Sequence, residues 1–206
     1  KIIHTSTSEV YGTAQFIPIS ENHPLQGQSP YSASKIGADK IAEAFFLSCG
    51  LPVVTLRPFN TFGPRQSARA VVPPIISQAL REGTVCLGNV HPTRDLNYVT
   101  NTVDGFVRGA SSPEAIGRTI NLGSGGEISI ENLVRMIGGL IGRAIEIHTE
   151  EERVRPEKSE VERLLADNTL AREVLGWEPS VTLEEGLKLT IEWMREHLNG
   201  YREGIY

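Results

Sequence analysis

Hydrophobic and polar positions along the chain first predict a strand, a helix and a second strand. Ile2 and Ile3 are interpreted as the end of a buried strand. Apolar residues at 38, 41, 42 and 45 recur at spacings of three and four, which predicts a helix over about 31–47 with one buried face. The β-branched run 51–57 then predicts a buried strand. Strand, helix and strand form a parallel crossover unit, which indicates a doubly wound sheet.

The remainder of the chain predicts shorter elements. The proline-rich segment 13–28 and the segment 64–69 are predicted to be loops, the glycine cluster 123–126 a strand-to-helix loop, and 150–152 a solvated run of charge. The predicted helices are 72–81, 102–110, 129–141, 168–175 and a last helix that opens with the capping box Thr182–Glu185 and carries apolar residues at 183, 187, 191, 194 and 198. The predicted strands are 85–87, 94–99, 119–122 and 144–148.

Composition narrows the classes of protein. The 206 residues suffice for one large or two small domains with a core. A net charge of −5, without a basic stripe, argues against a nucleic-acid binder. Cys49 and Cys86 lack metal-ligand or redox spacing, so we expect reduced thiols in the interior and no metal site. No apolar run reaches membrane-spanning length and there is no signal peptide, so we expect a cytoplasmic protein without a membrane partner.

Two segments carry candidate acid–base chemistry. Tyr31 and Lys35 lie four residues apart, so on a helix they share a face, and a nearby cation favours a phenolate. Upstream, the predicted strand ends in a hydroxyl-rich segment that holds one carboxylate, Glu9. Side chains at the carboxyl end of a strand, followed by this helix, form a plausible acid–base site. An exposed helical pair and an exposed loop carboxylate are the alternative interpretations.

These residues belong to motifs with a family resemblance. The segment Ser6–Gly12 (STSEVYG), the pair Tyr31-x-x-x-Lys35 and the run Arg57–Asn60 (RPFN) resemble the extended short-chain dehydrogenase/reductases, the NAD-dependent epimerase/dehydratase family. Within it the chain looks like the nucleotide-sugar 4,6-dehydratases. The segments 28–39 and 63–70 are similar to hexosamine 4,6-dehydratases of legionaminic-acid-type biosynthesis. The resemblance extends through 94–99 and 153–156 to the end of the chain.

The resemblance implies an α/β fold in two parts. Residues 1–62 are expected to be the C-terminal part of a doubly wound, Rossmann-type NAD-binding domain. Residues 63–206 are expected to form mainly a smaller α/β region that binds the nucleotide sugar, with some segments returning to the Rossmann sheet. The dinucleotide fingerprint Gly-x-Gly-x-x-Gly is absent from these residues, so we expect the N-terminal Rossmann portion to be missing. Family members pair through the helix that begins at Tyr31, which implies a homodimer.

The resemblance also implies residue roles. Tyr31 would be the base at the sugar O4, with Lys35 favouring its phenolate and gripping the ribose of NAD. Thr7 would hydrogen-bond O4. Glu9 would be the base at C5, and Ser8 stands where thymidine-linked glucose dehydratases have aspartate, which leaves the departing water to Glu9 as well. The residues implied at NAD are Ser6, Tyr31, Lys35, Pro58 and Asn60. Those implied at the nucleotide sugar are Asn60, Val72, Arg94, Tyr98 and Arg155.

Four further residues near these motifs are also considered for a role. Arg65 and Arg69 could meet the substrate or form surface salt bridges. Asp95 is expected to be a structural partner of Arg94. Asn101 stands where the family usually has aspartate, and a structural role is expected for it.

Three functions compete. The first is a 4,6-dehydratase acting on UDP- or GDP-linked N-acetylglucosamine. The second is a nucleotide-sugar 4-epimerase, which needs no C5 base; by the resemblance, the pair Thr7-x-Glu9 favours the dehydratase. The third is a fragment that binds sugar nucleotide without catalysis. The absent fingerprint favours this fragment, because hydride transfer requires a nicotinamide that the protein binds and orients.

Overall fold

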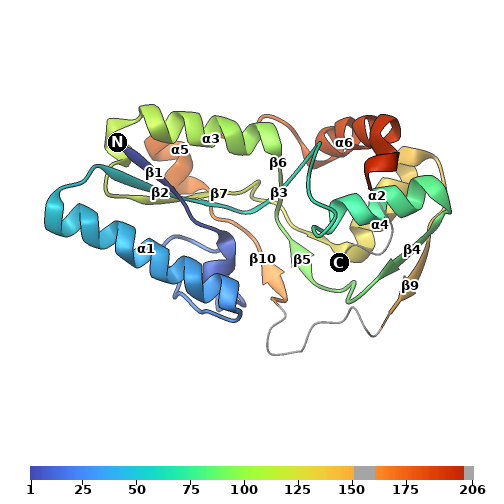
Figure 1. Cartoon of the computed structure of the whole chain (residues 1–206), viewed down its shortest axis with the longest axis horizontal. Coiled ribbons are helices and arrows are strands. Elements are labelled where there is room, and N and C mark those ends of the chain that lie inside the picture. Colours follow the sequence, from blue (N-terminus) through green and yellow to red (C-terminus); the bar gives the residue numbers. More distant parts are fainter. Residues whose placement is uncertain (151–160, 202–206) are drawn as a thin grey trace.

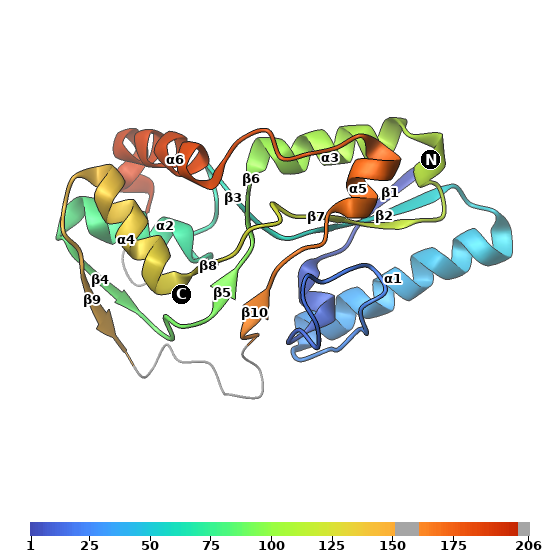
Figure 2. The same ribbon diagram turned by 180° about the vertical axis from the view of Figure 1, so that it is seen from behind.

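The computed structural model describes residues 1–150 and 161–201, and its first part is a parallel sheet with helices on both faces (Figure 1). The sheet has the order β1-β2-β7 and all its pairs are parallel. Its strands are β1 (Ile2–Thr5), β2 (Val53–Pro58) and β7 (Thr119–Leu122). The helix α1 (Pro30–Cys49) lies on one face, whereas α3 (Val99–Ser111) and α5 (Thr169–Leu175) lie on the other (Figures 1 and 2). The predicted strand–helix–strand crossover and the α/β fold with a parallel sheet are therefore confirmed.

A second group of elements packs beside this sheet (Figure 2). Its helices are α2 (Val72–Arg81), α4 (Ile130–Ile141) and α6 (Leu183–His197). Its strands are β3 (Asn60–Phe62), β4 (Thr84–Leu87), β5 (Thr93–Arg94), β6 (Leu96–Tyr98), β8 (Ile128–Ser129), β9 (Glu146–Thr149) and β10 (Arg163–Leu164). They pair as β10-β5-β8, β3-β6 and β4-β9. Apolar side chains from α2, α4 and α6 form the core of this group.

The ends of the helices follow the local signals in the sequence. Ser29 and Ser32 form a capping box at the start of α1, and Gly50 ends that helix in the left-handed conformation. The capping box of Thr182 and Glu185 opens α6 as predicted, and its buried face includes Leu187. The predicted helix 102–110 begins earlier, at Val99, and the predicted strand 94–99 is divided into β5 and β6.

Three predictions of burial are wrong. The apolar face of α1 is not covered, since Ile41 is 62% and Phe45 51% exposed while Ser32 and Asp39 are the residues of this helix that are buried. Apolar spacing shows that side chains share a face, but not that this chain supplies a partner for it. Ile2 is 47% exposed because β1 is an edge strand of the described sheet. Cys49 is exposed at the end of α1, and Cys86 is half-buried.

Candidate active site

A short turn after β1 positions the predicted hydroxyl and carboxylate groups. Thr7 is the N-cap of a 3₁₀ turn, Ser8–Tyr11, and its Oγ1 accepts a hydrogen bond from the N–H of Glu9 at 3.2 Å. Gly12, at φ 64°, ends the turn in a conformation that favours glycine. Ser8 points into the interior, whereas Glu9 is partly exposed. The turn therefore fixes the position of the Glu9 backbone, from which the side chain with its carboxylate extends.

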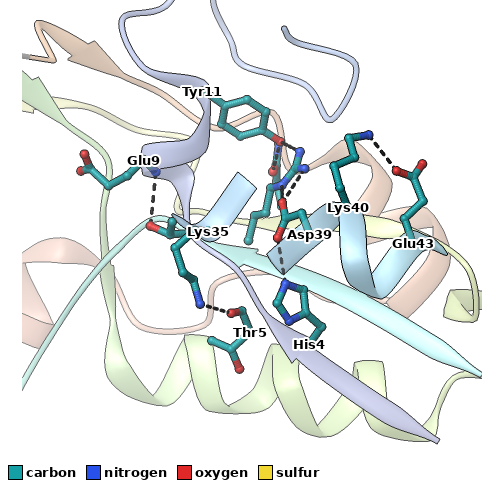
Figure 3. A network of polar contacts seen from close by, with 11 residues as sticks. His4, Thr5, Glu9, Tyr11, Lys35, Asp39, Lys40 and Glu43 are labelled. Atoms are coloured by element: carbon teal, nitrogen blue, oxygen red, sulfur yellow. Dashed lines mark hydrogen bonds and ion pairs between the residues drawn. The ribbon is translucent and has the colours of Figure 1, made fainter. Parts of the chain in front are cut away.

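Lys35 extends from α1 toward the carboxyl end of β1. Its Nζ donates to the carbonyl oxygen of Thr5 at 2.6 Å, close to the turn that carries Glu9 (Figure 3). Tyr31 lies one helical turn earlier, and its side chain is 56% exposed. The structure thus brings Lys35 to the hydroxyl-rich segment, as the sequence predicts. Tyr31 lies in the first turn of the same helix, where it is exposed.

A buried polar cluster, which we call the Asp39 network, attaches α1 to the sheet. The Asp39 carboxylate contacts His4 Nε2 at 2.8 Å through Oδ1, and accepts from Arg57 Nη2 at 2.8 Å through Oδ2 (Figure 3). Arg57 Nη1 donates to the Tyr11 hydroxyl at 2.9 Å, and that hydroxyl donates to Asn121 Oδ1 at 2.7 Å. Burial raises the pKa of Tyr11, although Arg57 opposes the shift, so the phenol stays protonated and donates.

A cavity of about 260 Å³ lies beside the turn and is called here the Glu9 cavity. The residues that carry its chemistry are Glu9, Asn60, Gln66, Arg69, Val72 and Arg94. The residues that line this cavity include some from the first part of the chain, from the loop before α2 and from β5. One acidic and two basic residues therefore line one cavity. Arg69, for which the sequence left a surface salt bridge as an alternative, lines this cavity. Gln66 lines it too and was missed because a loop offers no periodicity.

Several other expected residues lie elsewhere. The Tyr98 ring packs at 5.6 Å from the Phe62 ring, within the core beneath α6, and does not line the Glu9 cavity. Pro58 is the last residue of β2. Arg65 is exposed and lines a different cavity. Arg155 and the charge run beyond residue 150 lie outside the described residues.

The expected pairing of Asp95 with Arg94 is replaced by a different role. Asp95 is fully buried, and its carboxylate accepts four hydrogen bonds, from Ser124 N–H and Oγ and from the N–H groups of Gly125 and Ala166. The glycine cluster 123–126 is therefore a structural loop wrapped around this carboxylate. Asn101 is structural as expected, since it is buried and bonds to the backbone of Val181.

The residues at the end of β1 fit a polar ligand such as NAD. The hydroxyl of Ser6 is buried and has no hydrogen-bond partner within residues 1–150 and 161–201. Lys35 carries three donors, one of which is bound to Thr5. An unpaired hydroxyl and an ammonium group suit the hydroxyl and amide groups of a dinucleotide. Tyr31, Lys35 and Ser6 would hold such a ligand.

The fold defines a Rossmann-type α/β protein, with a candidate polar site at the carboxyl ends of its parallel strands. The chain belongs to the NAD-dependent epimerase/dehydratase family, because a family model described as GDP-mannose 4,6 dehydratase matches residues 1–190.

Relatives and solved structures support this membership. The chain is 38% identical to a UDP-glucose 4-epimerase of Mycolicibacterium smegmatis, covering 95% of this chain and 62% of the relative. It is 31% identical to a dTDP-glucose 4,6-dehydratase of Xanthomonas campestris, covering 100% and 62%. A Bacillus anthracis dTDP-glucose 4,6-dehydratase, solved with NAD, matches at TM-score 0.88 and 28% identity over 97% of this chain and 63% of that one. TunA, an NDP-hexosamine 5,6-dehydratase of tunicamycin biosynthesis, matches at TM-score 0.83 and 31% identity over 94% and 62%.

These matches confirm the broader expectations. The chain spans about three-fifths of the length of these relatives, and both dehydratases and epimerases are among them. A structural relative binds NAD. In the described part of the chain, each helix is too short or too polar to cross a membrane.

Proposed function

We propose that this chain carries the acid–base residues and the substrate cavity of an NAD-dependent nucleotide-sugar 4,6-dehydratase. We assign UDP- or GDP-linked N-acetylglucosamine as the substrate class. The observation that carries this proposal is that Glu9 lines the same cavity as Arg69 and Arg94. A nucleotide sugar presents a diphosphate next to a sugar ring. Its binding therefore needs cations, and its dehydration needs a carboxylate base in the same space.

The two arginines suit the diphosphate. A guanidinium group binds phosphate oxygens in a bidentate fork, and its charge is retained at every physiological pH. Asn60 adds an amide that can bind a phosphate or sugar oxygen. With the diphosphate at Arg69 and Arg94, the attached sugar would meet the wall that carries Glu9. The presence of two arginines and a carboxylate at one cavity supports this proposal.

The acid–base steps follow from the side chains at this end of β1. Tyr31 takes the proton from the sugar O4, aided by the Lys35 cation and a hydrogen bond from Thr7 to O4. Glu9 removes the C5 proton, which a neighbouring ketone makes acidic, and returns a proton to the departing C6 hydroxyl. Ser8 cannot supply that proton as a carboxylic acid would. The chemistry that NAD supplies when bound is acceptance of hydride from C4 and its return at C6. C5 then takes up a proton from solvent, which completes the 4-keto-6-deoxy product, and Tyr31 releases the O4 proton to solvent.

A 4-epimerase is the second candidate, and the 38% identity to the M. smegmatis epimerase favours it. The two reactions differ at C5, because an epimerase inverts C4 and leaves the C5 proton in place. A carboxylate at position 9 has an acid–base task only in the dehydratase. The fate of the C5 proton therefore separates the candidates.

The test is turnover in deuterium oxide with NAD and UDP- or GDP-N-acetylglucosamine, followed by mass spectrometry. The dehydratase predicts a product that has lost one water and carries solvent deuterium at C5, whereas an epimerase gives a product of unchanged formula. Glu9→Gln should slow turnover by about 100-fold or more. The exposed Glu192→Gln on α6 is the matched control and should keep the wild-type rate.

Calorimetric titration separates binding from turnover. Sugar nucleotide should bind to the chain, and Arg69→Ala should weaken that binding, while the exposed Arg195→Ala on α6 should not. Binding of sugar nucleotide without binding of NAD would indicate a substrate-binding piece without catalysis. Failure of both UDP- and GDP-N-acetylglucosamine to bind would refute the assignment of the cavity.

A further inference from the structure

The loop at residues 63–70 forms one wall of the Glu9 cavity, through Gln66 and Arg69. Its backbone adopts a conformation that its sequence does not favour. Arg65 has φ 66°, in the left-handed region that side-chain-bearing residues rarely occupy. The buried Gln66 Oε1 has no hydrogen-bond partner in the part of the chain that the structure describes. Hydrogen bonds inside the loop hold part of its shape, from the Gln66 N–H to the Gly63 carbonyl at 3.3 Å and from the Ala70 N–H to the Ser67 carbonyl at 3.0 Å, and contacts from outside the loop add to them.

Two further hydrogen bonds join Gln66 to residues outside the loop. Its side-chain Nε2 donates to the carbonyl oxygen of Thr61 at 2.7 Å, next to Asn60 of the cavity. Its backbone carbonyl accepts from the Tyr201 hydroxyl at 2.9 Å. The second bond joins the cavity wall to a residue 135 positions away, beyond the end of α6.

Tyr201 is itself fixed by its surroundings. Arg81, the last residue of α2, donates from Nη2 to the carbonyl oxygens of Tyr201 at 2.8 Å and Leu198 at 3.0 Å. The Tyr201 ring packs edge-on against Trp193, with ring centroids 6.1 Å apart. Burial raises the pKa of the Tyr201 phenol, so the hydroxyl remains a donor at neutral pH. The Tyr201 hydroxyl thus links the loop to Arg81 at the end of α2 and to Trp193 of α6.

We propose that Tyr201 is a positioning residue that sets the shape of the 63–70 wall of the Glu9 cavity. Without its hydroxyl, the carbonyl of Gln66 loses its fixed donor and the loop can relax from the conformation at Arg65. Gln66 and Arg69 would then no longer be held against the cavity. The consequence for ligand binding rests on the proposed function, whereas the shape of the wall does not.

The test compares the wild-type chain with Tyr201→Phe, which keeps the ring against Trp193 and removes only the hydroxyl. Asn199→Ala, an exposed change in the same C-terminal turn, is the matched control. Hydrogen–deuterium exchange should become faster in peptides covering 63–70 in Tyr201→Phe, and stay unchanged in α4. The Kd for UDP-N-acetylglucosamine should rise about two- to tenfold, as expected for one lost hydrogen bond.

Each outcome decides the proposal. Unchanged exchange in 63–70 overturns it, whether or not ligand binds. Faster exchange with an unchanged Kd also overturns it, because the wall would then be free without consequence for the cavity. Faster exchange in a chain that binds no sugar nucleotide supports the role of Tyr201 and refutes the ligand assigned by the proposed function.

Discussion

Loss of the Asp39 carboxylate should destabilise this chain strongly. Its carboxylate is 5% exposed and bonds to two strands at once, to His4 of β1 at 2.8 Å and to Arg57 of β2 at 2.8 and 3.2 Å. Asp39→Ala would leave the Arg57 guanidinium buried, with the Tyr11 hydroxyl as its described partner. Removal of one member of a buried pair costs about 3–5 kcal/mol, because the other charge stays desolvated.

The expected change is large enough to separate from surface effects. At about 2–4 °C per kcal/mol for a chain of this size, Asp39→Ala should lower the melting temperature by roughly 6–20 °C. Asp39→Asn keeps an acceptor oxygen and should cost less, about 1–3 kcal/mol. Lys40→Ala is the control on the same helix, since its pair with Glu43 is exposed on both sides. That change should cost about 0–1 kcal/mol.

Urea unfolding followed by tryptophan fluorescence measures these differences, with Trp177 as a fully buried reporter. The double variant Asp39→Ala/Arg57→Met should be more stable than Asp39→Ala alone, because it removes the stranded charge. A loss of less than about 1 kcal/mol for Asp39→Ala, within the range of ordinary substitutions, would refute the reasoning. Equal stability of the single and double variants would also contradict it.

Three further predictions concern other parts of the chain. Burial raises the pKa of Glu21, so the folded state binds its proton more tightly than the unfolded state and stability falls as pH rises from the ordinary value of about 4.3. Glu21→Gln should therefore make the melting temperature fall less steeply as the pH rises above about 4.3, and parallel curves for the two proteins would contradict this. Gly186→Ala places a Cβ 2.7 Å from the Tyr98 ring and should cost about 1–3 kcal/mol in urea unfolding. Gly139→Ala meets no atom within 4 Å and should gain about 0.5–1 kcal/mol, so equal effects would refute the packing argument. Phe45→Glu should convert a homodimer formed through α1 to a monomer in sedimentation, and a variant that stays dimeric would place the interface elsewhere.

A local signal predicted where α6 begins, whereas long-range contacts decided which faces are buried. The capping box of α6 acts within one helical turn, so the sequence alone revealed it. The burial of Asp39 depends on His4, 35 residues earlier, and Arg57, 18 residues later. The periodicity within the helix gives no information about such distant partners. β8 and β10, two residues each, are too short to carry a pattern.

The site shows the same division. Glu9, Tyr31 and Lys35 were candidates because they lie at a strand end and at the start of the next helix, where parallel folds place ligands, whereas Thr7 followed from the family resemblance. Gln66 was missed and Arg69 ranked low because a loop has no periodic face and because Tyr201, which holds it, is 135 residues away. Asp95 was assigned to its neighbour Arg94, although its partners come from residues 124, 125 and 166.

The Asp39 network explains how α1 can be fixed against the sheet by one face and leave an apolar face exposed. Apolar packing is non-directional, whereas a carboxylate with bonds to two strands fixes both the rotation and the axial position of α1. Because Lys35 lies one turn before Asp39, this anchor sets Lys35 Nζ on the Thr5 carbonyl. Attachment by buried charge also leaves Ile41 and Phe45 exposed on the far side of the helix. The same helix therefore fixes the position of Lys35 against β1 and leaves an apolar face exposed.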